Sequence, residues 1–387
     1  MPLALTLTSR VLVLHSTPKL FTPVQIGAIA CANRVFMAPL TRCRSLPGSD
    51  APHALNAEYY AQRANAGLIV SEATQVLATG KGYVGTPGIY SPEQEAGWKL
   101  VTAAVHQKGG KIVAQLWHVG AISHPDMQPG GALPVTATEG FNPGGTTRTQ
   151  NGIVPRVAAR GLSNAEVHET IAAYRHSCEV AKRAGFDGVE IHSANGYLLE
   201  QFIRDSSNQR NDEFGGSLEN RLRFTLATID VAIAVFGADR VGIRVSPLTG
   251  SNNAKPDSNP QATYSALVAA LASRKIAFVH FIEGNTGVVR EVAGFDFEAA
   301  RRTLSASGVA YIANNRYNRA MALDSVESGE SDAVAFGVDY ISNPDLMERL
   351  KLNAPINPAN TKTYYGPGPV GYTDYPSLAQ EAFKQSA

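Results

Sequence analysis

The feature that most constrains the fold is a succession of short apolar runs, each rich in β-branched residues and followed by a segment of helical period. Parallel strands that are buried on both faces have this near-continuous apolar character, and helices connect them. Eight such runs occur, at residues 34–40, 67–73, 111–117, 188–192, 241–247, 277–283, 309–314 and 333–337. Eight strands that alternate with helices predict an α/β fold, a closed (β/α)8 TIM barrel.

The helical segments and the first strand end support this prediction. The longest helical pattern covers residues 164–184, and Ser163 and Glu166 at its start have the spacing of a capping box. An open doubly wound sheet is the alternative, but it would want a glycine-rich turn after its first strand. The first strand ends in Pro39-Leu40-Thr41 instead, which favours the barrel.

Two segments lie outside the repeat. Residues 19–33 alternate loosely around Gly27, and we expect an N-terminal hairpin that closes the bottom of the barrel. Residues 119–160 are rich in Gly, Pro and Thr and are far longer than an ordinary connection, which is typical of a lid or binding element. Because this long loop follows strand 3, it should cover the C-terminal mouth, where enzymes of this architecture keep their active sites.

Length and charge bound the domains and partners. We expect one domain over residues 19–387, since barrels with insertions reach more than about 400 residues. Residues 1–18 are interpreted as a loose extension, because Arg10 interrupts them and no charged start precedes them as in a signal peptide. The net charge of +1 lacks the field that nucleic acid binding needs. No stretch approaches the ~18 apolar residues of a membrane span.

Cysteine usage indicates the compartment. Cys31, Cys43 and Cys178 are too few and too scattered for a disulfide framework, a zinc site or a four-cysteine iron–sulfur cluster. We therefore expect a cytoplasmic protein that holds no metal. The oligomeric state stays open between a monomer and a homodimer.

A polar segment, His192-Ser193-Ala194-Asn195-Gly196-Tyr197, ends the fourth strand. A neutral imidazole N–H and an amide NH2 are both donors, and together they can hold a carbonyl oxygen as it becomes an enolate. Tyr197 offers a phenol whose ordinary pKa of about 10 lets it deliver a proton at neutral pH. On these residues alone, catalysis and the simple satisfaction of buried hydrogen bonds are equally good interpretations.

The sequence further along favours catalysis. Residues 208–221, NQRNDEFGGSLENR, resemble the signature of the old yellow enzyme family and its 12-oxophytodienoate reductases. This string is also a polar turn with a glycine pair before a capped helix, so part of its role is to shape the barrel. The resemblance runs from Leu20 to Pro376. It implies an FMN-dependent ene-reductase that uses NADPH or NADH to reduce the C=C bond of α,β-unsaturated aldehydes, ketones and related activated alkenes.

The resemblance also assigns a site for tightly bound, non-covalent FMN. It places Thr41 next to the flavin C4 carbonyl, Gln115 on the pyrimidine edge and Arg244 on the N1–O2 edge. For Arg244, an arginine in an apolar run, a salt bridge is the alternative. The expected FMN contacts are Pro39, Leu40, Thr41, Ala73, Gln115, Arg244, Asn315, Arg316, Gly337 and Val338.

The phosphate end of this site departs from the family pattern. Where the family has Gly-Arg before an aromatic residue, the chain has Gly337-Val338-Asp339-Tyr340, so the phosphate-binding arginine is absent. Residues 313–317, ANNRY, replace the usual small glycine-rich turn. Backbone amides at a helix N-terminus bind phosphate without side chains, and Arg316 could restore the lost charge. The alternative is that Arg316 points into solvent and FMN is held more weakly.

For the substrate, the resemblance implies that enones and phenolic ligands stack on the flavin. His192 and Asn195 would hold the substrate oxygen, the hydride would come from flavin N5, and Tyr197 would protonate the α carbon. A barrel dehydrogenase with an iron–sulfur cluster is excluded by the cysteines and the length. A flavin- or phenol-binding barrel with little turnover is the remaining alternative. The pocket residues implied are Trp117, for which plain barrel packing is the alternative, Tyr83, Tyr364 and Tyr365.

Overall fold

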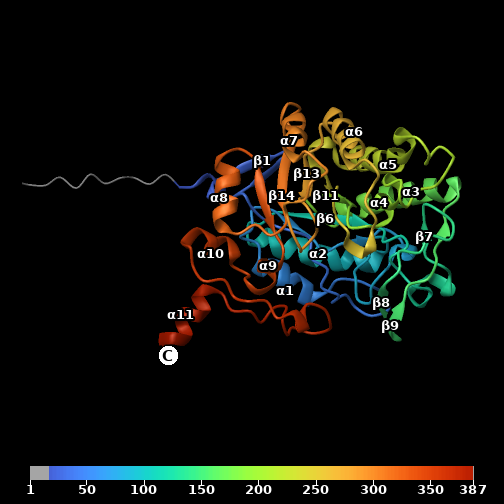
Figure 1. Cartoon of the computed structure of the whole chain (residues 1–387). Coiled ribbons are helices and arrows are strands. Elements are labelled where there is room, and N and C mark those ends of the chain that lie inside the picture. Colours follow the sequence, from blue (N-terminus) through green and yellow to red (C-terminus); the bar gives the residue numbers. More distant parts are fainter. Residues whose placement is uncertain (1–16, 387) are drawn as a thin grey trace, which may run out of the picture.

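The eight apolar runs form eight parallel strands that close into a barrel, with helices packed around it (Figure 1). The computed structural model describes residues 17–386. Strand β11 pairs with both β12 and β6, which closes the ring and excludes the open sheet. A short strand β5 (Thr74–Gln75) adds a second pairing to β6. The barrel strands are β3 (Val35–Met37), β4 (Ile69–Val70), β6 (Ile112–Trp117), β11 (Gly188–Ser193), β12 (Val241–Val245), β13 (Phe278–Ile282), β14 (Ala310–Asn314) and β15 (Ala333–Phe336).

Helices follow the strands as the sequence pattern predicts. The predicted capping box is present: the Ser163 hydroxyl accepts the Glu166 amide, and the Glu166 carboxylate accepts the Ser163 amide. Among residues 17–386, no helix is both long and apolar enough to span a bilayer. The helices are α1 (Ala54–Gln62), α2 (Pro92–Gln107), α3 (Asn164–Arg183), α4 (Leu198–Ile203), α5 (Leu218–Phe236), α6 (Pro260–Ser273), α7 (Phe297–Ser305), α8 (Arg319–Glu327), α9 (Val338–Ser342), α10 (Leu346–Leu352) and α11 (Leu378–Ser386).

The N-terminal hairpin closes the bottom of the barrel, as predicted. It consists of β1 (Val24–Ile26) and β2 (Ile29–Cys31), joined at Gly27 with φ +54°. The Ala28 amide donates to the Asp239 carbonyl at 2.8 Å, just before β12 begins. A Cβ at Gly27 would lie 2.1 Å from the same carbonyl oxygen, so only glycine fits this close approach. Of the extension predicted over 1–18, residues 1–16 lie outside the described part of the chain.

The interior of the barrel changes from apolar at the bottom to polar towards the mouth. Phe36, Phe278 and Ile312 pack with the hairpin residues Ile26 and Ile29 in one buried cluster. Further along the strands, polar side chains replace the apolar ones on the inner face. Residues two apart on a strand share a face of the sheet. On neighbouring strands, Gln115 of β6 is in register with Glu190 of β11. Arg244 of β12 is in register with His192 of β11 and with His280 of β13.

The long loop after β6 carries small strands of its own. Strands β7 (Val135–Thr136) and β10 (Arg160–Gly161) pair in parallel, and β8 (Thr146–Thr149) and β9 (Gly152–Pro155) form an antiparallel hairpin. The signature string anchors this loop, since Arg210 Nη1 donates to the Ala137 carbonyl at 2.9 Å. In Figure 1 the β8–β9 hairpin lies at the periphery, beyond the helices of the barrel.

Candidate active site

A cavity of about 800 Å³ opens beside the C-terminal ends of the barrel strands. Thr41 follows β3, Tyr83 precedes α2, and Tyr197 follows β11. These three side chains and Tyr365 line the cavity, together with Thr146 and Thr147 of the β8–β9 hairpin. The long loop therefore lies over the mouth, as its position after β6 predicts.

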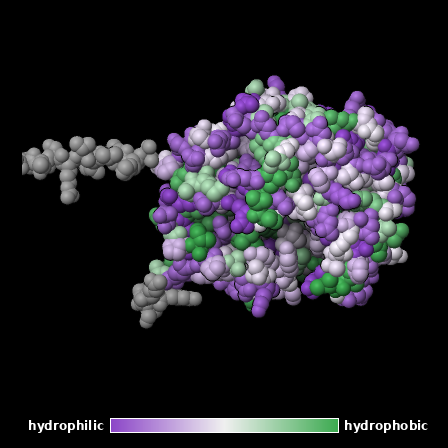
Figure 2. All heavy atoms as spheres, in the orientation of Figure 1, coloured by the Kyte–Doolittle hydropathy of each residue, from purple (hydrophilic) through white to green (hydrophobic). Residues whose placement is uncertain are grey.

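The rim of the cavity is apolar. Leu46, Val84, Ile153 and Tyr365 line it and are 42%, 43%, 63% and 61% exposed. On the face seen in Figure 2, hydrophobic residues lie among hydrophilic ones. Large apolar side chains gathered around one opening are typical of a binding site for an apolar ligand.

Four of the predicted site residues form one aromatic cluster beneath the mouth. The Trp117 ring stacks on Tyr83 at 5.9 Å and on His192 at 6.2 Å between ring centroids. Tyr197 meets Trp117 edge to face at 4.9 Å, and its hydroxyl lies 3.0 Å from the Tyr83 hydroxyl. Ala73 packs into the same cluster. Trp117 is thus fully buried, as barrel packing would require, and it also contacts two predicted site residues, Tyr83 and His192.

Burial sets the protonation of the two central groups. The pKa of His192 lies well below its ordinary value because the ring is buried and because Arg244 and His280 add unfavourable positive charge. His192 is therefore a neutral imidazole at pH 7, with its Nδ1 buried and without a hydrogen-bond partner in the described chain. Burial raises the pKa of Tyr197, so the phenol keeps its proton. A neutral donor and a protonated acid stand side by side.

Asn195 is held by groups on two neighbouring loops. Its backbone is left-handed, with φ +59°. Its amide N–H donates to Ser246 Oγ at 2.8 Å, and its side-chain oxygen accepts the Thr286 hydroxyl at 2.8 Å. This arrangement leaves the Asn195 NH2 group as the donor that remains for a ligand. No hydrogen bond joins Asn195 to His192 within residues 17–386.

Beneath His192, the predicted site residues Gln115 and Arg244 belong to a layer of buried polar side chains that also contains Glu190, His280 and Asn314, which were not expected from the sequence. Gln115 Nε2 donates to Glu190 at 2.7 Å, and the other Glu190 oxygen lies 2.8 Å from His280 Nδ1. Arg244 Nη2 donates to Asn314 Oδ1 at 2.7 Å. The sequence did hold a signal for Glu190 and His280, because they are polar residues inside the apolar runs of β11 and β13.

Arg244 has no carboxylate partner in the described chain, so the salt bridge considered as an alternative is not formed. Burial lowers its pKa to about 10, which keeps the guanidinium charged at neutral pH. Its Nε is buried without a hydrogen-bond partner, as is the indole Nε1 of Trp117. Buried donors that lack partners are rare in folded proteins. The layer therefore fits a ligand that presents acceptor atoms, such as the polar edge of an isoalloxazine ring.

At the phosphate end, the replacement turn is engaged with the loop after β13. The buried Asn315 donates from Nδ2 to the Glu283 carbonyl at 2.7 Å and to the Asn285 carbonyl at 3.0 Å. Arg316 is exposed, and its Nη1 donates to the Gly287 carbonyl at 3.0 Å. Val338 begins α9, after Gly337, and is 54% exposed. The exposed guanidinium of Arg316 retains further N–H groups for an anion.

Two further arginines shape the mouth and were not singled out from the sequence. Arg42 Nη2 donates to the Gly371 carbonyl at 2.6 Å, and its Nε donates to the Tyr364 carbonyl at 3.0 Å. Arg44 donates to the carbonyls of Thr363, Gly368 and Val370, each at 3.0 Å. These bonds fasten the C-terminal segment over the cavity. Tyr365 consequently lines the cavity. Tyr364 packs edge to face against the Tyr365 ring and is not part of the lining.

Pro39 and Leu40 are half-buried and lead from β3 to Thr41, so the predicted first-strand motif runs along the mouth. The cavity, the partnerless donors of the polar layer and the adjacent proton donor are together typical of a cofactor-dependent barrel oxidoreductase.

Comparison with known proteins gives the family. The model of the NADH:flavin oxidoreductase / NADH oxidase family matches residues 19–357. The chain is 41% identical to 12-oxophytodienoate reductase 7 of Oryza sativa subsp. japonica over 383 residues, which cover 93% of this chain and 95% of that one. The solved structure of morphinone reductase is 41% identical, with a TM-score of 0.88, and the match covers 95% and 98% of the two chains.

The old yellow enzyme from Trypanosoma cruzi is a further structural relative, 34% identical with a TM-score of 0.87 over 94% of this chain and 99% of that one. The protein belongs to the old yellow enzyme family. It is an NAD(P)H-dependent oxidoreductase whose cofactor is FMN.

Proposed function

We propose that the protein is an ene-reductase that uses NADPH or NADH to reduce the C=C bond of α,β-unsaturated aldehydes, ketones and related activated alkenes. The observation that carries this proposal is the pairing of a neutral His192 donor with the protonated phenol of Tyr197, 5.2 Å apart between ring centroids. When bound, FMN supplies the transfer of hydride from the nicotinamide to the β carbon of the substrate.

The side chains of the protein polarise the substrate and move its proton. His192 and the Asn195 NH2 group hold the carbonyl oxygen and stabilise the negative charge that develops there. Tyr197 then donates its proton to the α carbon. The Tyr83 hydroxyl, 3.0 Å away and on the cavity wall, can return a proton to Tyr197 from solvent.

The cofactor site that supports this chemistry is the polar layer and the β3 motif. Thr41, Gln115 and Arg244 would contact the isoalloxazine ring, and the Arg244 charge would stabilise its reduced anionic form. At the other end, Arg316 would take the role of the missing arginine at Val338, as its exposed guanidinium allows. We infer tight, non-covalent binding of one FMN per chain.

Bulky enones and phenols fit this site best. The cavity of about 800 Å³ is large, and its rim is apolar. The relatives include reductases of 12-oxophytodienoate and morphinone, and one solved structure holds TcOYE with pHBA.

A flavin- or phenol-binding barrel with little turnover is the second candidate, favoured by the exposed Val338 where a phosphate-binding arginine would stand. An absorbance spectrum of the purified protein, followed by anaerobic reduction with each nicotinamide and reoxidation by 2-cyclohexenone, separates the two. Reduction without reoxidation by the enone would favour the binding protein.

We further propose that residues 19–387 form one domain and that the protein works as a monomer or homodimer in the cytoplasm. The three cysteines are all unpaired, which suits a reducing compartment.

A further inference from the structure

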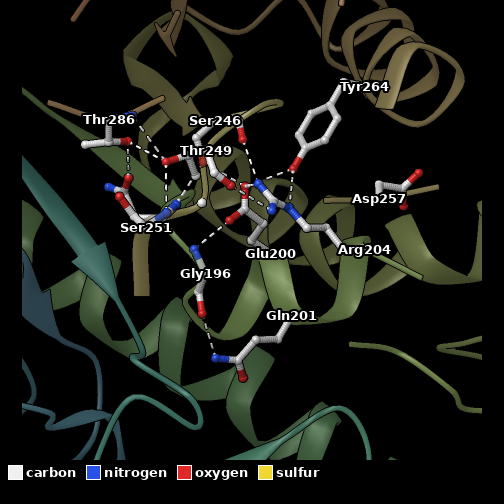
Figure 3. Close-up of polar contacts among 12 residues, drawn as sticks. Gly196, Glu200, Gln201, Arg204, Ser246, Thr249, Ser251, Asp257, Tyr264 and Thr286 are labelled. Atoms are coloured by element: carbon white, nitrogen blue, oxygen red, sulfur yellow. Dashed lines mark hydrogen bonds and ion pairs between the residues drawn. The ribbon is translucent and has the colours of Figure 1, made fainter. Parts of the chain in front are cut away.

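A buried ion pair contacts the loop that carries Asn195 and Tyr197, and Figure 3 shows it next to Gly196 of that loop. Glu200 lies on α4 and Arg204 is the residue that caps the C-terminus of this helix, with Arg204 Nη2 3.0 Å from Glu200 Oε1. Their exposed fractions are 0% and 1%. Buried salt bridges add little to stability, because the loss of hydration offsets the attraction between the charges. The pair therefore calls for a role beyond holding α4 together.

The Glu200 carboxylate accepts hydrogen bonds from this loop, one directly and one through Ser246. Its Oε2 accepts the Gly196 N–H at 2.5 Å. Its Oε1 accepts the Ser246 hydroxyl at 2.7 Å, and the same Ser246 oxygen accepts the Asn195 N–H at 2.8 Å. Two consecutive amides of the loop thus end on one carboxylate, the first of them through Ser246. Figure 3 shows Ser246 and Gly196 converging on Glu200.

The loop needs such support because its backbone is unusual. Asn195 and Gly196 are both left-handed, with φ values of +59° and +77°. The N–H groups of these two residues are outside any helix or sheet and need other acceptors, which the Ser246 hydroxyl and the Glu200 carboxylate supply. A Cβ at Gly196 would lie 3.0 Å from the Ala254 side chain, so the backbone passes close to the next loop.

Arg204 extends the same network to the loop after β12. Its Nη1 donates to the Thr249 carbonyl at 3.0 Å, and its Nη2 donates to the Ser246 carbonyl at 2.9 Å. The Thr249 hydroxyl lies 2.8 Å from that of Thr286, which in turn donates to the Asn195 side-chain oxygen at 2.8 Å. The ion pair is therefore connected to Asn195 by two paths. One leads through Ser246 to the Asn195 backbone N–H, and the other through Thr249 and Thr286 to the Asn195 side chain. Tyr264 completes the carboxylate shell with a bond of 2.9 Å to Glu200.

We propose that Glu200 and Arg204 are positioning residues of the reaction: they aim the Asn195 amide and the Tyr197 phenol at the substrate through the backbone amides of residues 195 and 196. This inference rests on the proposed ene-reductase function. It assigns control of the enone half of the reaction to a buried ion pair that does not line the cavity.

The test is Glu200→Gln in the FMN-loaded enzyme, with reoxidation by 2-cyclohexenone followed by anaerobic stopped flow. The amide keeps the size of the side chain but replaces one acceptor with a donor that faces Arg204 or Gly196. We expect reoxidation to slow by about 10- to 100-fold, since a shift of about 1 Å in a reacting group costs about that much. In the Asn195→Ala/Tyr197→Phe background, the same substitution should slow it by less than about 3-fold, because both groups that it aims are already gone.

The matched control is Asp345→Asn, which breaks another buried pair four residues apart: Arg349 on α10 lies 2.8 Å from Asp345, the residue before the helix. It should lower the melting temperature and leave reoxidation within about 3-fold of the parent. Ser246→Ala is the second variant, should Glu200→Gln not fold. It removes the hydroxyl bridge alone and should slow reoxidation by about 3- to 10-fold, the worth of one hydrogen bond.

Equal slowing by Glu200→Gln with and without the Asn195 amide and the Tyr197 hydroxyl, or no slowing at all, would overturn the positioning role. Where Ser246→Ala takes the place of Glu200→Gln, the same two results would overturn it. A parent enzyme that 2-cyclohexenone fails to reoxidise would instead overturn the proposed function, so the two failures are distinct.

Discussion

The most informative perturbation of the site is Tyr197→Phe, because it removes one oxygen atom and little else. The ring would keep its edge-to-face contacts with Trp117 at 4.9 Å and with His192 at 5.2 Å. Substrate binding should therefore change little. The hydroxyl that is lost lies at the cavity, 3.0 Å from the Tyr83 hydroxyl.

The expected magnitude follows from the role of the phenol as a positioned acid. Such groups contribute about 100- to 10,000-fold, which corresponds to about 2.7–5.4 kcal/mol in the barrier. A water molecule can take the place of the lost hydroxyl in part. Anaerobic stopped flow should show reoxidation by an enone slowed by this factor, with the reduction of FMN by NADPH nearly unchanged. That reduction step needs no acid.

Tyr83→Phe is the control for this prediction. It removes the neighbouring hydroxyl but leaves the proposed acid in place, so reoxidation should slow by less than about 10-fold. If the traces instead showed Tyr197→Phe crippling the reduction of FMN by NADPH while enone turnover was spared, the assignment of Tyr197 would have to be abandoned.

Three more outcomes are expected. The protein should purify yellow with one FMN per chain, and a colourless protein that gains no activity on addition of FMN would contradict the cofactor site. Arg316→Ala should release FMN more readily in equilibrium dialysis, whereas Val338→Arg should retain it as well or better; unchanged retention in Arg316→Ala would refute the compensation. The enone reoxidation rate should be flat from about pH 6 to about pH 9, because burial raises the pKa of the acid Tyr197 and lowers that of the donor His192. A rate that falls with an apparent pKa near 7 would point to a different proton donor.

The barrel was predictable because its signal is local. Each of the eight runs is short, mainly apolar and rich in β-branched or aromatic residues, and that pattern marks a strand buried on both faces whatever lies elsewhere in the chain. The hairpin around Gly27 and the capping box at Ser163 are local as well. The order of parallel strands and the position of the mouth then follow from the handedness and connectivity of such folds.

The sequence by itself therefore determined the barrel, the loop over its mouth and, through its resemblance to the family, the residues that surround a flavin. Only the tertiary structure decided which of those side chains meet. Tyr83 and Tyr197 are 114 positions apart, and Glu190 and His280 are 90 apart, yet each pair is in hydrogen-bond contact. Such contacts depend on strand register and on how loops cross the mouth, and neither leaves a periodic trace in the chain. For the same reason, Tyr365 rather than its neighbour Tyr364 lines the cavity: long-range bonds from arginines after β3 set the path of the C-terminal segment.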